Sequence, residues 1–250
     1  RKLVDKQRLI FAVADGVTEG GLGDLASSLA CAYFGVEAIK LREGLKKGTI
    51  PREAVLELLE EVVKEASKVV MAILHDESQA APACTFDGCL IYQDTAYICH
   101  CGDGRVYYLD SNASLRLLTE DHNLIPTSVP KEKRVEYGVF YSQIYSYVGM
   151  EPEEMTIETL VQPLHPGEML FIASDGVANL LTSRELERIL QLDDLKKIRE
   201  ELLRLVNKPE GIARLYAEVM KTSFKQAQKK LGRKDDATYI VIKVMENANP

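Results

Sequence analysis

The stretch Arg8-Leu-Ile-Phe-Ala-Val-Ala-Asp-Gly16 decides the fold. Between its arginine and its aspartate every residue is apolar, which indicates a strand that is buried on both faces and runs into a turn. Met169-Leu-Phe-Ile-Ala173 repeats this pattern and leads to Asp175-Gly176. Near the end of the chain, the pair Asp235-Asp236 precedes a third apolar strand that runs to Val244. Three buried strands, each next to an aspartate, are therefore expected.

Two helical regions lie between the first strands, and a third lies near the end of the chain. Apolar residues of the first predicted helix recur at helical spacing: Leu25, Leu29, Ala32, Phe34 and Ile39. Gly44 and Gly48 are expected to break this helix, and Pro51 starts a second one that runs to about His75. Residues 183–231 are helical in character, and Ser183 fits an N-cap.

Further strands are predicted from alternating or continuous apolar runs: Phe86–Tyr92, Thr95–Cys101, Arg105–Leu109, Leu115–Leu118 and Met155–Gln162. The first two flank Gln93-Asp94, the pattern of a tight hairpin. Residues 122–147 are rich in aromatic residues and predict an irregular surface segment. Because the chain has neither repeats nor a low-complexity linker, we expect one α+β domain over residues 1–250.

Composition excludes several classes of function. The chain has 250 residues, of which 46% are hydrophobic, enough for one large core. Its 31 Lys and Arg against 38 Asp and Glu give a net charge of -7. An acidic chain of this kind does not attract nucleic acid or an anionic membrane by its net charge. No apolar run approaches a membrane span, and no signal-peptide pattern opens the sequence. We expect a monomer that binds neither nucleic acid nor membrane.

The five cysteines suggest two alternatives. An odd number in a chain of this length does not predict a disulfide framework, so the cytoplasm is the expected compartment. The triplet Cys99-His100-Cys101 could indicate zinc. The stronger interpretation is a strand that points both cysteines into the core, because no second Cys/His pair lies at a structural-zinc spacing.

The candidate chemistry comes from Asp15, Asp175 and Asp235, which adjoin the three buried strands. Carboxylates gathered at rigid strand ends need cations to neutralise them, and a set without His or Cys favours Mg²⁺ or Mn²⁺. The glycine at position 16 lets a backbone carbonyl approach a metal closely. Two such ions can activate a water for attack on a phosphoryl group. The alternative, that each Asp-Gly pair only makes a turn, explains one pair more easily than the whole set.

Ordered sequence blocks over nearly the whole chain resemble the metal-dependent protein phosphatases (PPM), the type 2C protein serine/threonine phosphatases, in their bacterial form. Phe11-Ala-Val-Ala-Asp-Gly16 resembles the family's "FAVADG", and Gly102-Asp-Gly-Arg105 is similar to "GDSR". Other blocks match in the same order: Gly23–Ser27 with "GExAS", Cys84-Thr85 with "GTT", Leu118–His122 with "LTxDH", Ala173–Gly176 with "SDG", and Asp235–Thr238 with "DNxT". Several blocks at compatible spacings are much more specific than any single motif.

The resemblance implies a four-layer α-β-β-α sandwich, in which two antiparallel sheets pack face to face and are flanked by helices. It implies that Asp15 contacts both metals and that Gly16 completes one coordination shell. Asp175 and Asp235 are implied as further ligands of the pair. Asp103 corresponds to a ligand of a third, weaker cation, with a structural turn carboxylate as the alternative. No catalytic residue beyond these ligands is predicted.

Three residues of the matching blocks are expected to be structural. The resemblance assigns Arg105 to an ion pair with a carboxylate. It assigns Thr119 and His122 to hydrogen bonds that organise a loop. Residues 124–147 are implied as a variable flap beside the site, where the choice of partner would be made.

The chain departs from the family pattern at three places. The usual Arg-x-x-Asn-x-Asp motif, which supplies a phosphate-binding arginine, is absent, and we expect a domain that lacks its N-terminal strand. The loop Val17-Thr-Glu-Gly20 replaces the glycines and histidine that usually follow "DG". Glu19 there is either an extra carboxylate near the metals or a solvated loop residue. Asp236 replaces an asparagine. The sequence therefore identifies no phosphate-binding residue.

The sequence favours hydrolysis of phosphoserine and phosphothreonine in proteins by a water that bridges two divalent cations. A phosphorylated protein, and a cognate kinase, are the expected partners. One alternative is a phosphatase-like module that binds phosphoproteins or regulates a partner with little catalysis. Another is a bacterial regulator that dephosphorylates one dedicated antagonist of a transcription factor, by the same chemistry.

Overall fold

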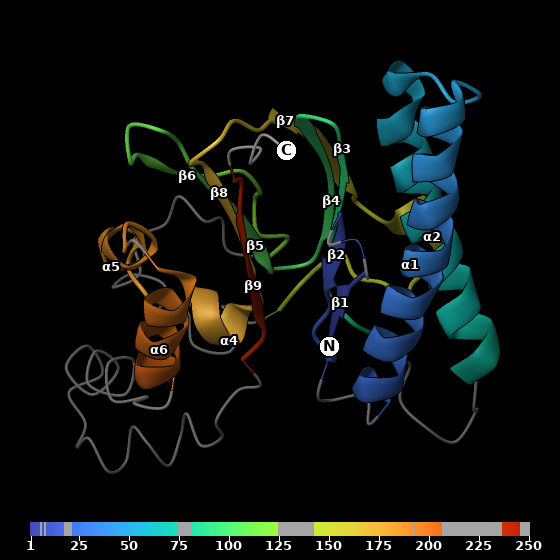
Figure 1. Ribbon diagram of the computed structural model, residues 1–250. Coiled ribbons are helices and arrows are strands. Elements are labelled where there is room, and N and C mark those ends of the chain that lie inside the picture. The colour runs from blue at the N-terminus through green and yellow to red at the C-terminus, as the bar shows by residue number, and fades with distance from the viewer. Residues whose placement is uncertain are drawn as a thin grey trace, which may run out of the picture.

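The computed structural model describes residues 1–5, 7, 9–17, 22–74, 82–124, 143–192, 194–206 and 237–245. In this part of the chain two antiparallel sheets pack face to face, and helices cover the outer face of each (Figure 1). The predicted four-layer α-β-β-α sandwich is confirmed.

The first sheet has the strand order β1-β2-β3-β4-β7 and the second has the order β6-β5-β8-β9. The strands of the first sheet are β1 (Lys2–Val4), β2 (Ile10–Val13), β3 (Phe86–Tyr92), β4 (Thr95–Cys101) and β7 (Glu158–Pro163). Those of the second are β5 (Arg105–Leu109), β6 (Leu115–Leu117), β8 (Met169–Ala173) and β9 (Tyr239–Lys243). Every pairing between neighbouring strands is antiparallel.

Helices α1 (Gly23–Lys47) and α2 (Val55–Leu74) cover the first sheet, with the short 3₁₀ turn η2 (Arg52–Ala54) before α2. The second sheet is covered by the other helices: α4 (Asp175–Ala178), α5 (Ser183–Leu190) and α6 (Leu195–Val206). A further 3₁₀ turn, η4 (Pro152–Glu154), precedes β7. Among the residues that the model describes, no helix combines the length and apolar character that a bilayer crossing requires.

The described residues form three hydrophobic clusters between the four layers. Along β2, Ile10 and Ala12 belong to the cluster under α1 and α2, whereas Phe11 and Val13 belong to the cluster between the sheets. The third cluster joins the outer face of the second sheet to α4, α5 and α6. Because both faces of the central strands are buried, their sequences are continuously apolar, as the opening stretch indicated.

The apolar face predicted for the first helix is correct only in part. Phe34 is fully buried and Leu29 packs against the core, but Leu25 and Ile39 are 51% and 50% exposed. The buried face of α1 is made mainly of smaller residues: Gly23, Ala26, Ser27, Ala30, Cys31, Phe34, Gly35, Ala38, Leu41, Gly44 and Leu45. Small residues let the helix approach the sheet and α2 closely, so side-chain size was a poor guide to orientation.

Gly44 does not break the helix as expected, because α1 continues to Lys47. A Cβ atom at position 44 would lie 2.5 Å from Cδ1 of Ile50, so this glycine makes room for packing. Gly48 ends the helix as a left-handed C-cap with φ of 68°. The expected stop is therefore correct at the second glycine and wrong at the first.

Other boundaries differ by a few residues. Strand β7 begins at Glu158 rather than Met155, and the N-cap of α5 is Thr182, whose side chain and Glu185 form a capping box. Strand β1 was not predicted. The predicted helical region beyond residue 206 and most of the predicted flap lie outside the described residues.

Candidate functional site

The register of the first sheet places the residue after β2 at one edge of the sandwich. Val13 pairs with Asp87 at the start of β3, and Asp87 pairs with His100 near the end of β4. The end of β2, the start of β3 and the end of β4 therefore share one edge. Asp15 follows β2 and Asp103 follows β4, so both carboxylates leave the sheet there.

The second sheet brings its own aspartate to the same end. Arg105, the first residue of β5, pairs with Ala173, the last residue of β8, and Ala173 pairs with Tyr239 at the start of β9. The short turn that carries Asp103 joins β4 directly to β5, so these edges of the two sheets coincide. Asp175 follows β8 at this edge and begins α4.

The segment before β9 leads to the same end of the sandwich. Asp235 and Asp236 lie outside the described residues, as does Glu19, so their predicted roles stay predictions.

Hydrogen bonds fix the backbone around two of the predicted ligands. The Asp15 N–H donates to Oγ1 of Thr85 at 3.1 Å, and the Thr85 N–H donates to the Asp15 carbonyl at 2.8 Å. On the second sheet, the Ser174 N–H donates to the Thr238 carbonyl at 2.9 Å, and the Thr238 N–H donates to Oγ of Ser174 at 3.2 Å. The aspartates at positions 15 and 175 therefore extend from backbones with fixed positions.

Crowding of carboxylates is strongest at Asp103. Burial, together with the negative charges of Asp121, Asp15 and Asp87, raises the pKa of Asp103 to about 7, against the opposing charge of Arg105. A carboxyl group with this pKa is costly to ionise at neutral pH. The donor set is made of hard oxygens, and a divalent cation would remove the electrostatic cost, so these residues fit Mg²⁺ or Mn²⁺.

A small cavity of about 210 Å³ lies beside Asp15 and Gly16 and is also lined by Arg1, Asp24, Ala237 and Thr238. Nη2 of Arg1 lies 3.8 Å from Oδ2 of Asp24. A Cβ atom at Gly16 would lie 2.4 Å from the backbone carbon of Gly23, so the residue after Asp15 has to be glycine for helix α1 to start this close. Arg1 and the two aspartates Asp15 and Asp24 therefore line one cavity.

The turn that carries Asp103 is held on both sides by the segment that follows β6. Arg105 donates from Nε and Nη2 to the two carboxylate oxygens of Asp121, at 2.7 and 2.6 Å. Although burial lowers the pKa of Arg105, the hydrogen bond and charge of Asp121 outweigh that effect and raise it above the ordinary value. Arg105 is therefore part of a buried ion pair, as expected from the sequence.

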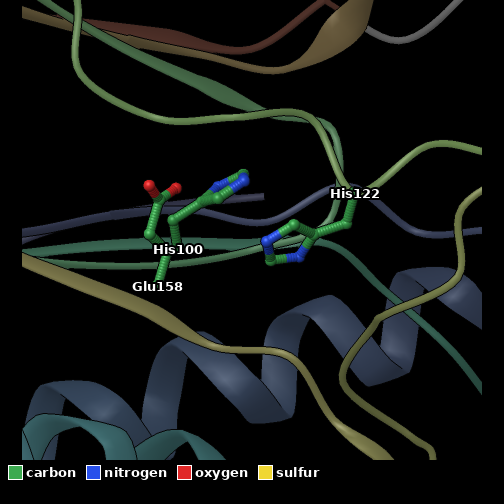
Figure 2. Close-up of side chains that lie close together, drawn as sticks. All are labelled: His100, His122 and Glu158. Atoms are coloured by element: carbon green, nitrogen blue, oxygen red, sulfur yellow. The ribbon is translucent and has the colours of Figure 1, made fainter. Parts of the chain in front are cut away.

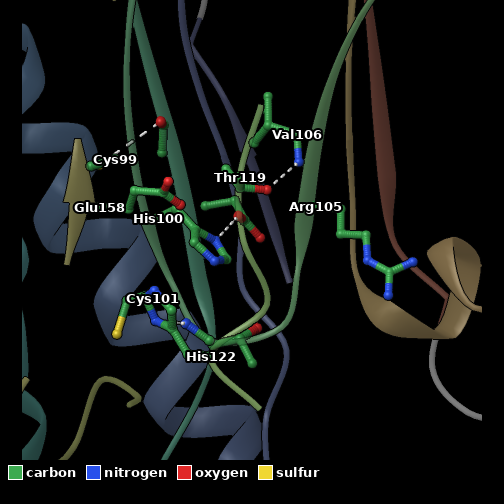
Figure 3. A network of polar contacts seen from close by, with 12 residues as sticks. Cys99, His100, Cys101, Arg105, Val106, Thr119, His122 and Glu158 are labelled. Atoms are coloured by element: carbon green, nitrogen blue, oxygen red, sulfur yellow. Dashed lines mark hydrogen bonds and ion pairs between the residues drawn. The ribbon is translucent and has the colours of Figure 1, made fainter. Parts of the chain in front are cut away.

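Thr119 and His122 make the loop hydrogen bonds expected of them. The Val106 N–H donates to Oγ1 of Thr119 at 3.1 Å (Figure 3). The Gly102 N–H donates to Nδ1 of His122 at 3.1 Å, and the His122 N–H donates to the Gly102 carbonyl at 2.7 Å. Residues on either side of Asp103 are thus tied to one segment.

A second group of potential metal ligands, His100, His122 and Glu158, lies nearby with ligand atoms within 4.8 Å of one another (Figure 2). Nδ1 of His122 accepts a hydrogen bond, and burial, with the charge of His100, lowers the pKa of His122 to about 4. The ring is therefore neutral, and its hydrogen lies on Nε2. A metal could bind Nε2 only if the hydrogen moved from Nε2 to Nδ1. Because Nδ1 accepts the hydrogen bond of the Gly102 N–H, it cannot carry that hydrogen, and this group is unsuited to hold an ion.

The directions of the side chains exclude the zinc alternative for the cysteine triplet. Cys99 and Cys101 belong to the cluster under α1 and α2, whereas the intervening His100 points to the opposite face of β4. All five cysteines are free and buried. The strand interpretation made from the alternation is therefore correct.

Sequence reasoning missed Asp87 and Arg1. Asp87 is fully buried in β3 beside His100, and the signal was available, because an aspartate inside an apolar strand needs a partner. Arg1 received no role, because the family's Arg-x-x-Asn-x-Asp motif is absent from the sequence. No local pattern could have placed this side chain beside Asp15.

A comparison with family models identifies this arrangement. Residues 2–224 match the model described as protein phosphatase 2C. The chain belongs to this family. Membership confirms the prediction of a metal-dependent protein serine/threonine phosphatase that uses divalent cations and acts on phosphoproteins.

Relatives agree with this assignment. The serine/threonine phosphatase stp of Listeria innocua is 27% identical over 197 residues, which cover 75% of this chain and 73% of the relative. The serine/threonine phosphatase PstP/Ppp of Mycobacterium tuberculosis has a similar fold, with a TM-score of 0.72 and 18% identity over 98% of this chain and 92% of that one. A PstP catalytic domain in complex with two manganese ions has a TM-score of 0.66 and 19% identity over 98% of this chain and 91% of that one.

Proposed function

We propose that this phosphatase hydrolyses phosphoserine and phosphothreonine with a water that bridges two divalent cations. The observation that carries the proposal is the meeting of strand ends, which brings Asp15, Asp103 and Asp175 to one end of the sandwich. We assign the cation pair to Asp15, the Gly16 carbonyl and Asp175, together with Asp235. The manganese pair bound by the PstP catalytic domain supports this number of ions.

Bound cations would supply an activated water and absorb the charge that develops on the phosphoryl oxygens. The protein residues have positioning roles. Thr85 fixes the peptide of Asp15, and the exchange of hydrogen bonds between Ser174 and Thr238 fixes the start of α4. Arg1 lines the cavity beside Asp15, whereas Arg105 is buried and bound by Asp121, so Arg1 is the arginine better placed to meet a phosphate that enters this cavity.

The finer assignments remain proposals. We propose a third, weaker cation at Asp103, a cognate kinase as partner, and a monomeric state. Five free cysteines, all buried, support a reducing compartment such as the cytoplasm. Mg²⁺ and Mn²⁺ both suit the oxygen ligands, and the choice between them is left to measurement.

A phosphoserine peptide should be hydrolysed in millimolar Mn²⁺ or Mg²⁺ and not in EDTA. We expect a difference of at least about a hundredfold, because the cations would contribute several kcal/mol to the transition state. Release of inorganic phosphate measures this rate. A matched rate in EDTA would contradict the two-cation mechanism, and hydrolysis without any preference for divalent over monovalent salt would do the same.

Mn²⁺ should also raise the melting temperature, because an ion that binds only the folded state stabilises it by about 2.7 kcal/mol at a hundredfold excess over its Kd. Asp15→Ala should weaken this response, since Asp15 is assigned to both ions. Differential scanning calorimetry with a monovalent salt at matched ionic strength separates binding from screening. A melting curve that ignores millimolar Mn²⁺ would favour the phosphatase-like binding module instead.

A further inference from the structure

Three polar residues form a row across the first sheet, at the end of the gap between the two sheets. Asp87 of β3 pairs directly with His100 of β4, and His100 pairs directly with Glu158 of β7. Asp87 and His100 are fully buried, and Glu158 is half-buried. Neighbours two residues away on the same faces, Cys89 and Ile98, belong to the cluster between the sheets. We call Asp87, His100 and Glu158 the polar row.

The polar row holds the backbone of one residue, Glu120, from both sides. Nδ1 of His100 lies 2.7 Å from Oδ1 of Asp87, and its Nε2 lies 2.9 Å from the Glu120 carbonyl oxygen. A carbonyl only accepts, so Nε2 carries a hydrogen and donates it. The Glu120 N–H in turn donates to Oε2 of Glu158 at 3.0 Å. Both polar groups of the Glu120 backbone are therefore bound by cross-strand partners in the first sheet.

The residues that follow Glu120 are hydrogen-bonded to the turn that carries Asp103. Asp121 makes two hydrogen bonds with Arg105, and His122 exchanges two with the backbone of Gly102. Asp103 lies between those two contacts. The path from the sheet to the candidate ligand is therefore short and consists of hydrogen-bonded groups throughout.

Asp87 also reaches the turn directly. Its Oδ2 is buried and has no hydrogen-bond partner among the described residues. A Cβ atom at position 104 would lie 1.8 Å from this oxygen. Position 104, where the family's "GDSR" block has serine, is glycine here, and the absent side chain makes room for the Asp87 carboxylate. The polar row and the turn are thus fitted to each other by sterics as well as by hydrogen bonds.

We propose that the polar row positions Asp103, so that breaking the row weakens the cation held at Asp103 and leaves the ions at Asp15 and Asp175 bound. The inference rests on the proposed function, since it takes the assignment of a third cation to Asp103. Asp87, His100 and Glu158 are positioning residues, because they act through residues 120–122. Groups that orient a ligand in this way typically contribute ten- to a hundredfold to metal affinity.

The experiment is a titration of the EDTA-treated, dialysed protein with MnCl₂, in which the electron paramagnetic resonance signal of free Mn²⁺ gives the number and the Kd of the sites. Asp103→Asn should remove the weakest site. His100→Leu should raise the Kd of that site at least about tenfold and leave the tighter sites unchanged. In the Asp103→Asn background, His100→Leu should have no further effect, because the two changes act on one site.

Asp87→Asn is the matched control for Asp87→Leu. The asparagine amide can donate to Nδ1 of His100 while Nε2 still donates to Glu120, so the asparagine variant should keep the wild-type Kd and the leucine variant should behave like His100→Leu. If the buried leucine variants do not fold, Glu158→Ala tests the half-buried end of the row. We expect about a threefold rise in the same Kd, with Glu158→Gln unchanged because its amide oxygen still accepts.

Several outcomes overturn the inference. An unchanged weakest site in His100→Leu, an equal loss at all sites, or Mn²⁺ binding that ignores Asp103→Asn would each do so. A wild-type protein that binds no Mn²⁺ contradicts the proposed function itself. The titration therefore distinguishes a failure of the support from a failure of the metal centre.

Discussion

Asp175→Asn is expected to lower the turnover of a phosphoserine peptide by about a thousandfold or more, which corresponds to about 4 kcal/mol of transition-state stabilisation. Asp175 follows β8 at the edge where Asp15 and Asp103 also emerge, and we assign it to the cation pair. An amide keeps the size of the side chain and loses its charge, so cation binding should suffer far more than packing. Initial rates at saturating Mn²⁺ measure the effect.

The fold should tolerate this substitution. Removing one carboxylate from a crowded set relieves repulsion in the protein without cations, so the unfolding midpoint in EDTA should stay the same or rise. Asp94→Asn is the matched control, since Asp94 is an exposed aspartate in the β3–β4 turn of the first sheet, at the opposite end of the sandwich from the candidate site. Unchanged turnover in Asp175→Asn, or unfolding of that variant in EDTA, would contradict its assignment as a metal ligand.

Strand positions were predictable because burial on both faces leaves a continuous apolar run. The run between Arg8 and Asp15 and the run at Met169–Ala173 are both central strands, as predicted. The hairpin around Gln93-Asp94 was predictable from its turn, and with it the pairing of Asp87 with His100, which lie at equal distances from that turn. The fold class therefore follows from local patterns and from the order of the sequence blocks.

The orientation of α1 was not predictable in the same way. Its sequence has large apolar residues on both sides: Leu25, Val36 and Ile39 face outward, whereas Phe34, Leu41 and Leu45 face the core. Which side packs inward depends on how closely α2 and the sheet approach, and this is a property of the whole fold. The place of Arg1 beside Asp15 depends likewise on the pairing of β1 with β2, which no periodic pattern in three residues could indicate.

The candidate metal ligands could be predicted from the sequence only in part. An aspartate after a buried strand is visible in the sequence, but its meeting with the others depends on strand order and register. Val13 opposite Asp87, and Arg105 opposite Ala173, bring the strand ends to one edge. Asp15, Asp175 and Asp235 could be grouped from their places next to buried strands, but the resemblance to a family was needed to add Asp103.

Arg105→Met is expected to destabilise the fold by about 3–5 kcal/mol, a large part of the 5–15 kcal/mol typical of a domain. Arg105 and Asp121 are 6% and 3% exposed, and two hydrogen bonds join them. Methionine fills a similar volume but has no charge. The buried Asp121 carboxylate would then lose the cation at position 105, and this loss costs more than the ion pair contributed. Urea unfolding in EDTA measures the loss as a lower midpoint at an unchanged slope.

Two further variants decide whether the orphaned charge is the cause. In Arg105→Met with Asp121→Leu, both charged groups are replaced, so most of the lost stability should return. Arg116→Met changes an exposed arginine on the neighbouring strand β6 and should cost less than about 1 kcal/mol. If Arg105→Met costs no more than this control, the pair is not a structural element. If the double variant is no better than the single one, the loss comes from packing at position 105 and not from the carboxylate left behind.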